Sequence, residues 1–403
     1  MGGVSMEWKE VRLGDVCSRV CSGGTPKSTN LSYYGGEIPW LNTKEIDFNR
    51  IYSTEKTITD SGLNNSSAKW IAPNTVTVAM YGATAGKSCI VKVPMTTNQA
   101  CCNLTINDEV ADYEFVYYSL KNDYTTLASL ANGGAQQNLN AQIIKDYVLQ
   151  MPSLKDQRRI ASILSSLDRK IELNNKINAD LEEMAQAIFK NWFVDFEPFK
   201  DGKFVDSELG MIPEEWKVGT LGDITKNKSA KVKERNDVKV LSPVTTGELV
   251  LSEEYFTKQV FSSSIAKYKI VNKGDFAYNP ARVNIGSLGR NEFDFDGCVS
   301  PVYVVFSVLD GYENYFDLFR KTDFFKDSVA SLAIGGVRQS LSYDDLSSIE
   351  VIIPSENAVE EFNNLYNQMK KTIKANKLEN SRLSLLRDTL LPRLMSGELE
   401  VPE

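Results

Sequence analysis

Residues 157–191 form the uninterrupted stretch QRRIASILSSLDRKIELNNKINADLEEMAQAIFKN. Its apolar residues recur every three or four positions, and neither glycine nor proline interrupts it, which predicts one long amphipathic helix. At about 1.5 Å per residue such a helix is roughly 50 Å long. A helix of this length needs a partner along its apolar face.

The pattern returns at an offset of 202, and Pro152, just before the first helix, returns as Pro354. Seven apolar positions match at this offset: Ile160 and Phe362, Ile163 and Leu365, Leu167 and Met369, Ile171 and Ile373, Leu181 and Leu383, Met184 and Leu386, Ile188 and Leu390. Apolar steps of three and four over this length are typical of a coiled coil, with a helix buried in a globular bundle as the alternative.

Asparagines interrupt the apolar stripe at matching places, Asn174 and Asn178 in the first helix and Asn376 and Asn380 in the second. If the helices pack antiparallel about a pseudo-two-fold axis near residue 176, Asn174 faces Asn380 and Asn178 faces Asn376. Polar pairs inside an apolar seam control register, so we predict this role for the four asparagines.

The duplication extends outside the helices and spans nearly the whole chain. Three further motifs recur: Glu7-Trp8-Lys9 as Glu215-Trp216-Lys217, Leu13-Gly14-Asp15 as Leu221-Gly222-Asp223, and the GGAQQNL of residues 133–139 as the GGVRQSL of residues 335–341. The repeat predicts two similar domains, residues 1–152 and 207–354, followed by two helical segments, residues 153–206 and 355–403.

Each domain contains short β-like runs between glycine, proline and asparagine residues, which predicts an α+β fold with a mixed β-sheet and short helices. The runs are Thr75–Met80, Val299–Phe306 and Ile349–Ile353, and the short helices are expected at Asp112–Asn122 and Tyr312–Phe325. The predicted fold is thus two α+β domains separated by two long helices that pack as an antiparallel coiled coil.

Composition narrows the functional classes. The net charge of −8 argues against nonspecific coating of nucleic acid, so a local patch would have to carry any such contact. Residues 224–240 hold six basic against two acidic side chains, although a solvated lysine-rich loop is the ordinary alternative. The chain has no histidine, and its six cysteines form no CxxC pair, so we expect reduced thiols and no metal site. The absence of any apolar run long enough to span a membrane, and of a signal peptide, predicts a cytoplasmic location.

Two motifs resemble catalytic ones without matching them. Residues 82–88 (GATAGKS) resemble a phosphate-binding P-loop, but three residues instead of four separate the glycines. Asn279-Pro280-Ala281-Arg282 begins like the Asn-Pro-Pro-aromatic motif of adenine methyltransferases but lacks the aromatic that would stack on a flipped base. We therefore predict no catalytic residues in this chain.

Four further stretches carry a family resemblance: Gly23–Pro26 leading to Tyr33–Leu41, Pro152–Ala161, Leu209–Trp216 and Leu386–Leu399. In this order and spacing they resemble the specificity subunits of type I restriction-modification enzymes along almost the entire chain. The second domain departs from the pattern because it lacks the Gly-Gly-Thr-Pro stretch. The resemblance implies two target recognition domains, each of which recognises half of a bipartite DNA sequence, with the coiled coil setting the spacing.

Polar residues on predicted loops are the candidates for base and phosphate contacts. In the first domain they are Asn42, Thr43, Lys44, Tyr81, Lys87, Asn98, Gln99, Gln136 and Gln137. In the second domain they are Lys231, Lys233, Arg235, Thr245, Asn279, Arg282, Asn284, Arg338 and Gln339. An ordinary solvated or capping side chain is the alternative for each of them.

The resemblance also implies partners: double-stranded DNA, two methyltransferase subunits, and restriction subunits that join through the complex. S-adenosylmethionine, ATP and magnesium would bind to those partners, and no cofactor is expected on this chain. A methylation-only complex, a hidden nuclease or methyltransferase site, and a coiled-coil scaffold without DNA contact remain the alternatives.

Overall fold

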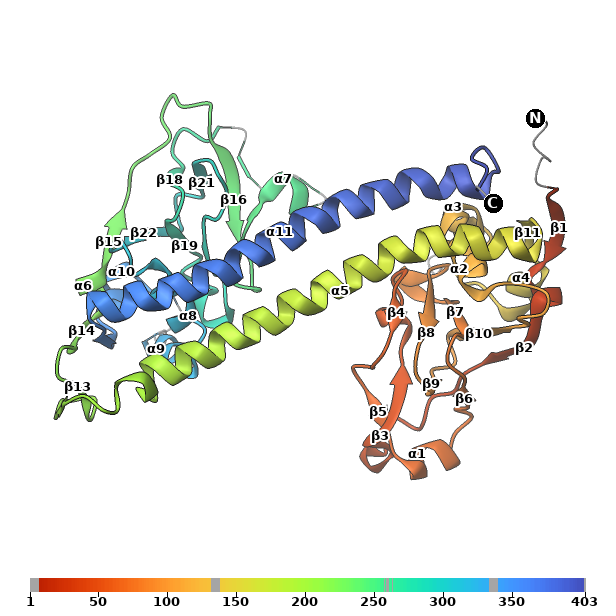
Figure 1. The fold of residues 1–403 in the computed structure, drawn as a ribbon, viewed down its shortest axis with the longest axis horizontal. Coiled ribbons are helices and arrows are strands. Elements are labelled where there is room, and N and C mark those ends of the chain that lie inside the picture. Colours follow the sequence, from red (N-terminus) through yellow and green to blue (C-terminus); the bar gives the residue numbers. More distant parts are fainter. Residues whose placement is uncertain are drawn as a thin grey trace. The chain divides into compact units, whose positions relative to one another are not determined.

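The computed structural model describes residues 7–131, 138–256, 258, 261–262, 264–332 and 340–401. The chain divides into two compact units (Figure 1). Unit 1 comprises residues 1–175 and 377–403, and unit 2 comprises residues 176–376. Each unit therefore contains one of the predicted domains and a part of each long helix.

The two long helices are α5 (Leu154–Phe193) and α11 (Glu356–Met395), each of 40 residues. Their bounds differ by 202 at both ends, so the repeat predicted from the sequence holds to the residue. A serine caps each helix: the hydroxyl of Ser153 accepts a hydrogen bond from the backbone N–H three residues on (3.2 Å), and that of Ser355 does the same (3.4 Å).

Domain 1 consists of short strands and helices in unit 1. Its strands are β1 (Lys9–Arg12), β2 (Cys17–Ser22), β3 (Tyr34–Leu41), β4 (Arg50–Ile51), β5 (Thr57–Ile58), β6 (Trp70–Ile71), β7 (Val76–Ala79), β8 (Ser88–Val91), β9 (Met95–Thr97), β10 (Cys101–Ile106) and β11 (Val148–Met151). Its helices are α1 (Asp60–Asn64), α2 (Tyr113–Asn122), α3 (Tyr124–Ser129) and α4 (Ala141–Asp146), with 3-10 turns η1 (Leu13–Val16), η2 (Leu31–Tyr33), η3 (Thr43–Glu45) and η4 (Gly82–Thr84).

Domain 2 has a similar set in unit 2. Its strands are β14 (Lys217–Thr220), β15 (Thr225–Lys228), β16 (Lys239–Pro243), β17 (Leu249–Leu251), β18 (Lys269–Val271), β19 (Phe276–Tyr278), β20 (Leu288–Arg290), β21 (Gly297–Val299), β22 (Val304–Val308) and β23 (Glu350–Ile353). Its helices are α6 (Leu221–Ile224), α7 (Ser252–Tyr255), α8 (Glu313–Phe319), α9 (Asp323–Leu332) and α10 (Tyr343–Ser347), with the 3-10 turn η6 (Val283–Ile285). Between α5 and β14 lie η5 (Glu197–Phe199), β12 (Phe204–Val205) and β13 (Ile212–Pro213).

The two domains share most of their topology. The strand order β2-β10-β7-β8 of domain 1 corresponds to β15-β22-β19-β20 of domain 2, and β5-β3-β9-β6 corresponds to β17-β16-β21-β18. The edge strand β4 of domain 1 has no counterpart in the described sheet of domain 2. The central pair of the second sheet is parallel in both domains, whereas its outer strands are antiparallel, so the sheets are mixed as the sequence predicts. A separate antiparallel pair, β1 with β11 and β14 with β23, joins the start of each domain to the strand that precedes its long helix.

Two of the predicted elements are wrong in their extent. The predicted strand Val299–Phe306 is two strands, since β21 ends at Val299 and β22 begins at Val304. Pro301 has no N–H to donate to a sheet, and a turn closes there with Tyr303 donating to the carbonyl of Ser300 (3.0 Å). The predicted helix Tyr312–Phe325 is likewise interrupted between α8 and α9, where the backbone N–H of Thr322 bonds to the Phe319 carbonyl three residues back (3.0 Å).

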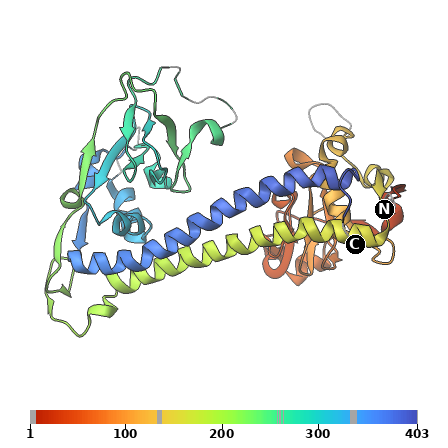
Figure 2. The ribbon, with the colours of Figure 1, turned by 45° about the horizontal axis from the view of Figure 1, so that its top comes forward.

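Helices α5 and α11 lie side by side and antiparallel within each unit (Figures 1 and 2). In unit 1, Asn174 donates to the side-chain oxygen of Asn380 (2.9 Å), and in unit 2, Asn376 donates to that of Asn178 (2.9 Å). Both pairs are the ones that the sequence predicts. Asn174 is 0% exposed and Asn178 is 6% exposed, so these amides lie inside the seam and not in solvent.

The buried stripe of the helices differs from the predicted one. Met184, Leu365 and Leu386, which were assigned to the seam, are exposed by 51%, 48% and 46%. The buried positions include Leu164 in unit 1 and Phe189 in unit 2, which belong to the same hydrophobic clusters as the adjoining domain. The periodicity identifies an apolar helix, but the domain packed on its side decides which apolar residues are covered.

The repeated tryptophans begin each domain and pack against the chain that follows a long helix. In unit 2, Trp216 contacts the rings of Phe193 and Phe199, with centroids 5.8 and 5.0 Å away. In unit 1, Trp8 lies against Gly397, where a Cβ would stand 2.6 Å from the indole nitrogen. Gly397 also has a positive φ of 74°, so glycine is required here both by the short distance to Trp8 and by the backbone conformation.

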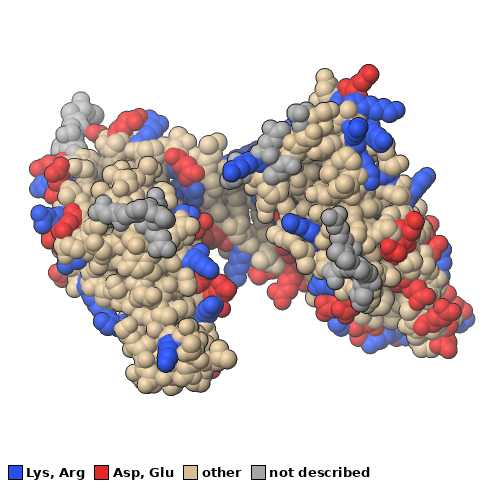
Figure 3. Space-filling model, turned by 180° about the vertical axis from the view of Figure 1, so that it is seen from behind, with Lys and Arg blue, Asp and Glu red and all other residues tan. Residues whose placement is uncertain are grey.

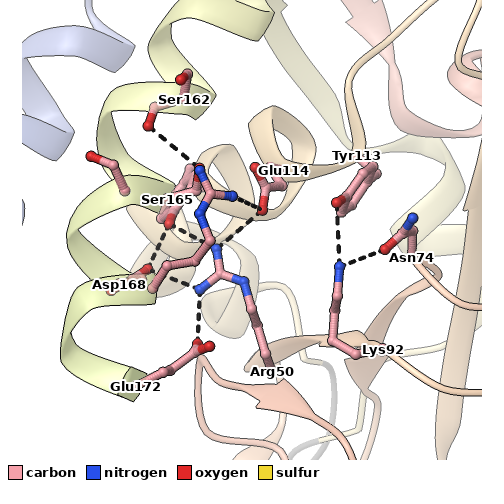
Figure 4. Close-up of polar contacts among 12 residues, drawn as sticks. Arg50, Asn74, Lys92, Tyr113, Glu114, Ser162, Ser165, Asp168 and Glu172 are labelled. Carbon is pink, nitrogen blue, oxygen red and sulfur yellow. Dashed lines mark hydrogen bonds and ion pairs between the residues drawn. The ribbon is translucent and has the colours of Figure 1, made fainter. Parts of the chain in front are cut away.

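A buried ion network attaches domain 1 to α5 (Figure 4). The Arg50 side chain on β4 is 3% exposed, donates to Glu172 (3.0 Å) on α5 and to Glu114 (3.3 Å) on α2, and lies 3.7 Å from Asp168. Tyr118 donates to the same Asp168 carboxylate (2.6 Å). Burial alone would lower the pKa of the Arg50 guanidinium, but its hydrogen bonds and charged neighbours raise that pKa above its usual value, so it stays charged.

No helix within the described ranges is long and apolar enough to cross a membrane.

Replacing Arg50 with methionine should destabilise domain 1 because three carboxylates would lose their buried counter-charge. The expected cost is about 3–5 kcal/mol, the usual result of removing one partner of a buried ion pair. Hydrogen–deuterium exchange of the α2 amides measures it locally. Arg169→Gln is the matched control: this exposed arginine meets the same Glu114 at 3.4 Å and should change stability by less than about 1 kcal/mol. Equal small effects of both substitutions would contradict the anchoring role.

Candidate nucleic-acid interface

The hairpin loop between β7 and β8 brings three segments of domain 1 together. Tyr81 in this loop is 40% exposed and forms a bridge with Asn138, while Leu139 donates to the Met80 carbonyl (2.7 Å). On the other side of the loop, the Thr84 hydroxyl donates to the carbonyl of Thr43 (2.9 Å). The loop is thus held between the η3 corner and the segment that follows residues 132–137.

Domain 2 has the equivalent loop between β19 and β20. The N–H of Leu341 donates to the Pro280 carbonyl (3.1 Å), which matches the contact of Leu139 in domain 1. Thr245 lies against the far end of the loop, since a Cβ on Gly286 would stand 2.6 Å from the Thr245 carbonyl oxygen. Gly286 also has a positive φ of 95°, so the loop can turn there at little cost.

The two motifs that resemble catalytic ones occupy these two loops. Residues 82–88 connect two strands, and Ser88 is the buried first residue of β8, whereas a P-loop leads into a helix. Asn279 uses its side-chain oxygen within the loop, where it accepts from the N–H of Ala281 (3.1 Å). Both stretches are therefore equivalent hairpin loops of a repeated domain.

The predicted residues around the domain 1 loop differ in whether their polar groups are exposed or already hydrogen-bonded within the domain. Asn42 caps η3, where its side-chain oxygen accepts from the N–H of Lys44 (3.2 Å), and Lys44 itself is exposed. Lys87 donates to Asp47 (2.6 Å). Asn98 is only 7% exposed and its oxygen accepts from a backbone N–H (3.1 Å), so it shapes the turn that presents the exposed Gln99.

The basic segment of domain 2 keeps part of its positive charge. Arg235 pairs with Asp237 (2.7 Å) and Asp296 (3.0 Å), and Lys228 pairs with Asp275 (2.7 Å). The hydrogen bonds that Arg235 donates to Asp237 and Asp296 raise the pKa of its guanidinium above the usual value. Exposed lysines of the segment remain: Lys226, Lys231, Lys233 and Lys239. Lysine and arginine side chains gather at the top of this domain, on the right in Figure 3.

Arg282 and Asn284 lie in the exposed part of the domain 2 loop, together with Ile285, which is 56% exposed and was not among the predicted residues. Ile285 is a candidate interface residue that could have been found from the equivalence of the two hairpin loops. The predicted residues Gln136, Gln137, Arg338 and Gln339 lie outside the described residues. Their segments lead directly into Asn138 and Leu341, which contact the hairpin loops.

The described parts of the chain contain no group of three or more histidine, cysteine or carboxylate side chains that could hold a metal ion. Burial raises the pKa of the Cys17 and Cys102 thiols to about 12, so both stay protonated near neutral pH and are poor nucleophiles. The groups presented by the hairpin loops are hydroxyl, amide, guanidinium and apolar, which suit contacts to base edges.

Comparisons with known proteins agree with this architecture. Residues 6–183 match the family model described as type I restriction modification DNA specificity domain. The type I restriction enzyme MjaIX specificity subunit of Methanocaldococcus jannaschii is 29% identical over all of this chain and 96% of its own length. The chain is therefore similar, over its whole length, to specificity subunits of type I restriction enzymes.

A further relative and a solved structure match the chain over nearly its full length. The HindI specificity subunit of Haemophilus influenzae is 23% identical over 98% of this chain and 100% of its own chain. The crystal structure of the type I specificity subunit from M. genitalium shares the fold, with a TM-score of 0.62 at 16% identity, covering 100% of this chain and 98% of that one.

Proposed function

We propose that this chain is a type I specificity subunit that selects a bipartite DNA target, with each domain recognising one half through its hairpin loop and the segments beside it. The observation that carries the proposal is the equivalence of the β7–β8 and β19–β20 loops, which present different side chains on one framework. A common framework with divergent loops fits two domains that recognise different DNA sequences. The net charge of −8 requires the DNA contact to be local, as such loops would make it.

The loop chemistry separates recognition from positioning. The exposed guanidinium of Arg282 can donate two parallel hydrogen bonds to a guanine in the major groove. The exposed ammonium of Lys44, at the η3 corner of domain 1, suits a phosphate, which carries no base identity. We therefore assign base contact to Arg282 and backbone contact to Lys44.

Arg282→Ala should relax the preference for one base in one half of the target, by about 1–3 kcal/mol of discrimination. Lys44→Gln should weaken binding to all targets alike and lower the slope of log affinity against log salt by about 0.9. Binding of the subunit, with its methyltransferase, to a library of duplexes at several salt concentrations measures both. An unchanged base preference in Arg282→Ala would contradict the assignment.

We further propose that the paired helices set the gap between the two half-sites. The support is continuity: α5 and α11 each run for 40 residues without a break, and each contributes to both units. The asparagine pairs beside the boundary between the units set the register, that is, which residue of α5 lies opposite which residue of α11. A helix pair of constant register would then act as a rigid spacer.

Inserting one heptad between Lys176 and Ile177 and another between Lys377 and Leu378 keeps the helices level and adds roughly 10 Å. The gap in the methylated motif should lengthen by about three base pairs, at roughly 3.4 Å per base pair. Sequencing of methylated DNA measures it. A heptad in α5 alone is the control and should abolish methylation because it breaks the register. An unchanged gap in the double insertion would overturn the spacer proposal.

Methyltransferase subunits are the proposed partners of the exposed apolar residues on the helices. Met184 in unit 2 and Leu386 in unit 1 are equivalent by the offset of 202 and are exposed by 51% and 46%. Equivalent apolar patches fit two copies of one partner, which would bring S-adenosylmethionine. Restriction subunits with ATP and magnesium would join through that complex.

Met184→Glu and Leu386→Glu should each reduce the methyltransferase bound from two copies to one, and the double substitution should abolish binding, because a carboxylate would have to be buried at each patch. Native mass spectrometry counts the copies. Asn191→Glu, at an exposed polar position of α5, is the matched control and should still bind two. Two copies on both single variants would place the docking surface elsewhere.

A further inference from the structure

The two domains attach to their helices through opposite charges. In unit 1 the acids are on the helix: Asp168 and Glu172 of α5 face the guanidinium of Arg50 from domain 1. The Arg50 side chain is 3% exposed and that of Asp168 is 9% exposed, so this contact is sheltered from water. We call these three residues the first attachment set.

In unit 2 the helix is basic at the equivalent positions, since residues 168 and 172 correspond to Lys370 and Lys374. Lys370 pairs with Glu292 of domain 2, and Lys374 pairs with Asp294 (3.0 Å). The ammonium groups of Lys273 and Lys374 lower the pKa of Asp294 to about 2, so it stays ionised over the neutral range. Lys370, Lys374, Glu292 and Asp294 form the second attachment set, in which the signs are reversed at both helix positions.

A second difference lies one turn closer to the start of each helix. In unit 2, Asn314 of α8 donates to the side-chain oxygens of Asn363 (2.9 Å) and Asn367 (2.9 Å) of α11. The α5 positions that correspond to these asparagines are Ala161, 2% exposed, and Ser165, 0% exposed. Ala161 lies in the same hydrophobic cluster as the α2 ring of domain 1, Phe115. One attachment therefore uses amides where the other uses apolar packing.

We propose that these attachment sets assign each domain to its own helix, so that a domain suited to one position does not attach stably at the other. Moved onto α11, domain 1 would place Arg50 beside Lys370 and Lys374. Moved onto α5, domain 2 would place Glu292 and Asp294 beside Asp168 and Glu172. Both exchanges replace ion pairs with like charges. The cost is largest where Arg50 would lose its partners, because this charge is buried. It is smaller for Glu292 and Asp294, whose side chains are 59% and 66% exposed.

The assignment matters because the two halves are otherwise equivalent. The helices have identical lengths and the domains share most of their strand order, so the helix backbones alone do not distinguish the two domains. Reversed charges at two equivalent helix positions remove that ambiguity and fix the order of the two domains. The proposal concerns folding and holds whatever the domains recognise.

The test uses a full-length chain in which the two domains are exchanged while both helices keep their sequence, compared with the native chain. In each context the pair Glu172→Lys with Lys374→Glu swaps one equivalent position between helices at constant net charge. The exposed-face pair Glu182→Lys with Lys371→Glu, also charge-neutral, is the control. Hydrogen–deuterium exchange of α2 reports on the attachment of domain 1.

We expect the Glu172–Lys374 swap to speed the exchange of α2 in the native chain, and to slow it in the domain-exchanged chain, by on the order of tenfold. If the swap acts through the contact between domain and helix, it changes the α2 exchange rate in opposite directions in the two chains. A change in helix stability alone would alter that rate in the same direction in both. The control swap should change neither.

The same sign in both contexts, or a domain-exchanged chain as stable as the native one, would overturn the proposal. If the exchanged chain does not fold, the helix residues described above are exchanged as well: positions 161, 165, 168 and 172 with positions 363, 367, 370 and 374. Recovery of folding supports the assignment, and failure to recover overturns it.

Discussion

The pairing of two buried asparagines of α5, Asn174 and Asn178, with asparagines of α11 is the constraint on which the rest of the structure depends. A buried amide that makes no hydrogen bond at all costs stability, so each of these two favours a register that gives it a partner. Asn174 meets Asn380 and Asn178 meets Asn376 at only one register of antiparallel helices. Since the two helices have the same length and an offset of 202, that register makes the two units equivalent halves.

Equivalence of the halves carries over to the domains and then to the candidate interface. Each domain joins its long helix through an antiparallel strand pair, and each presents a hairpin loop held by the segment after its double glycine. The framework is repeated while the loop side chains are not. An acidic chain with these two loops can recognise DNA only through local contacts, which agrees with a subunit that selects a target and leaves catalysis to others.

The sequence predicted most of the scaffold and less of the site, for identifiable reasons. The repeat of the two helices and the asparagine pairs followed from a constant offset, whereas the predicted helix 157–191 is shorter than α5 at both ends. Met184 was assigned to the seam because periodicity marks an apolar face but not what covers it. The loop equivalence was missed because Gly86 and Gly286 differ by 200 and not by 202, and Arg50 was missed because Glu172, its partner, lies 122 residues away.

Mapping the adenine methylation that appears in a host genome when this chain is expressed with a methyltransferase tests the proposed function most directly. The chain is expressed with its methyltransferase in a host free of other such systems, and modified bases are located by single-molecule sequencing. The account predicts one motif of two defined blocks separated by an undefined gap of fixed length. A single continuous motif, or methylation that does not depend on this chain, would contradict it.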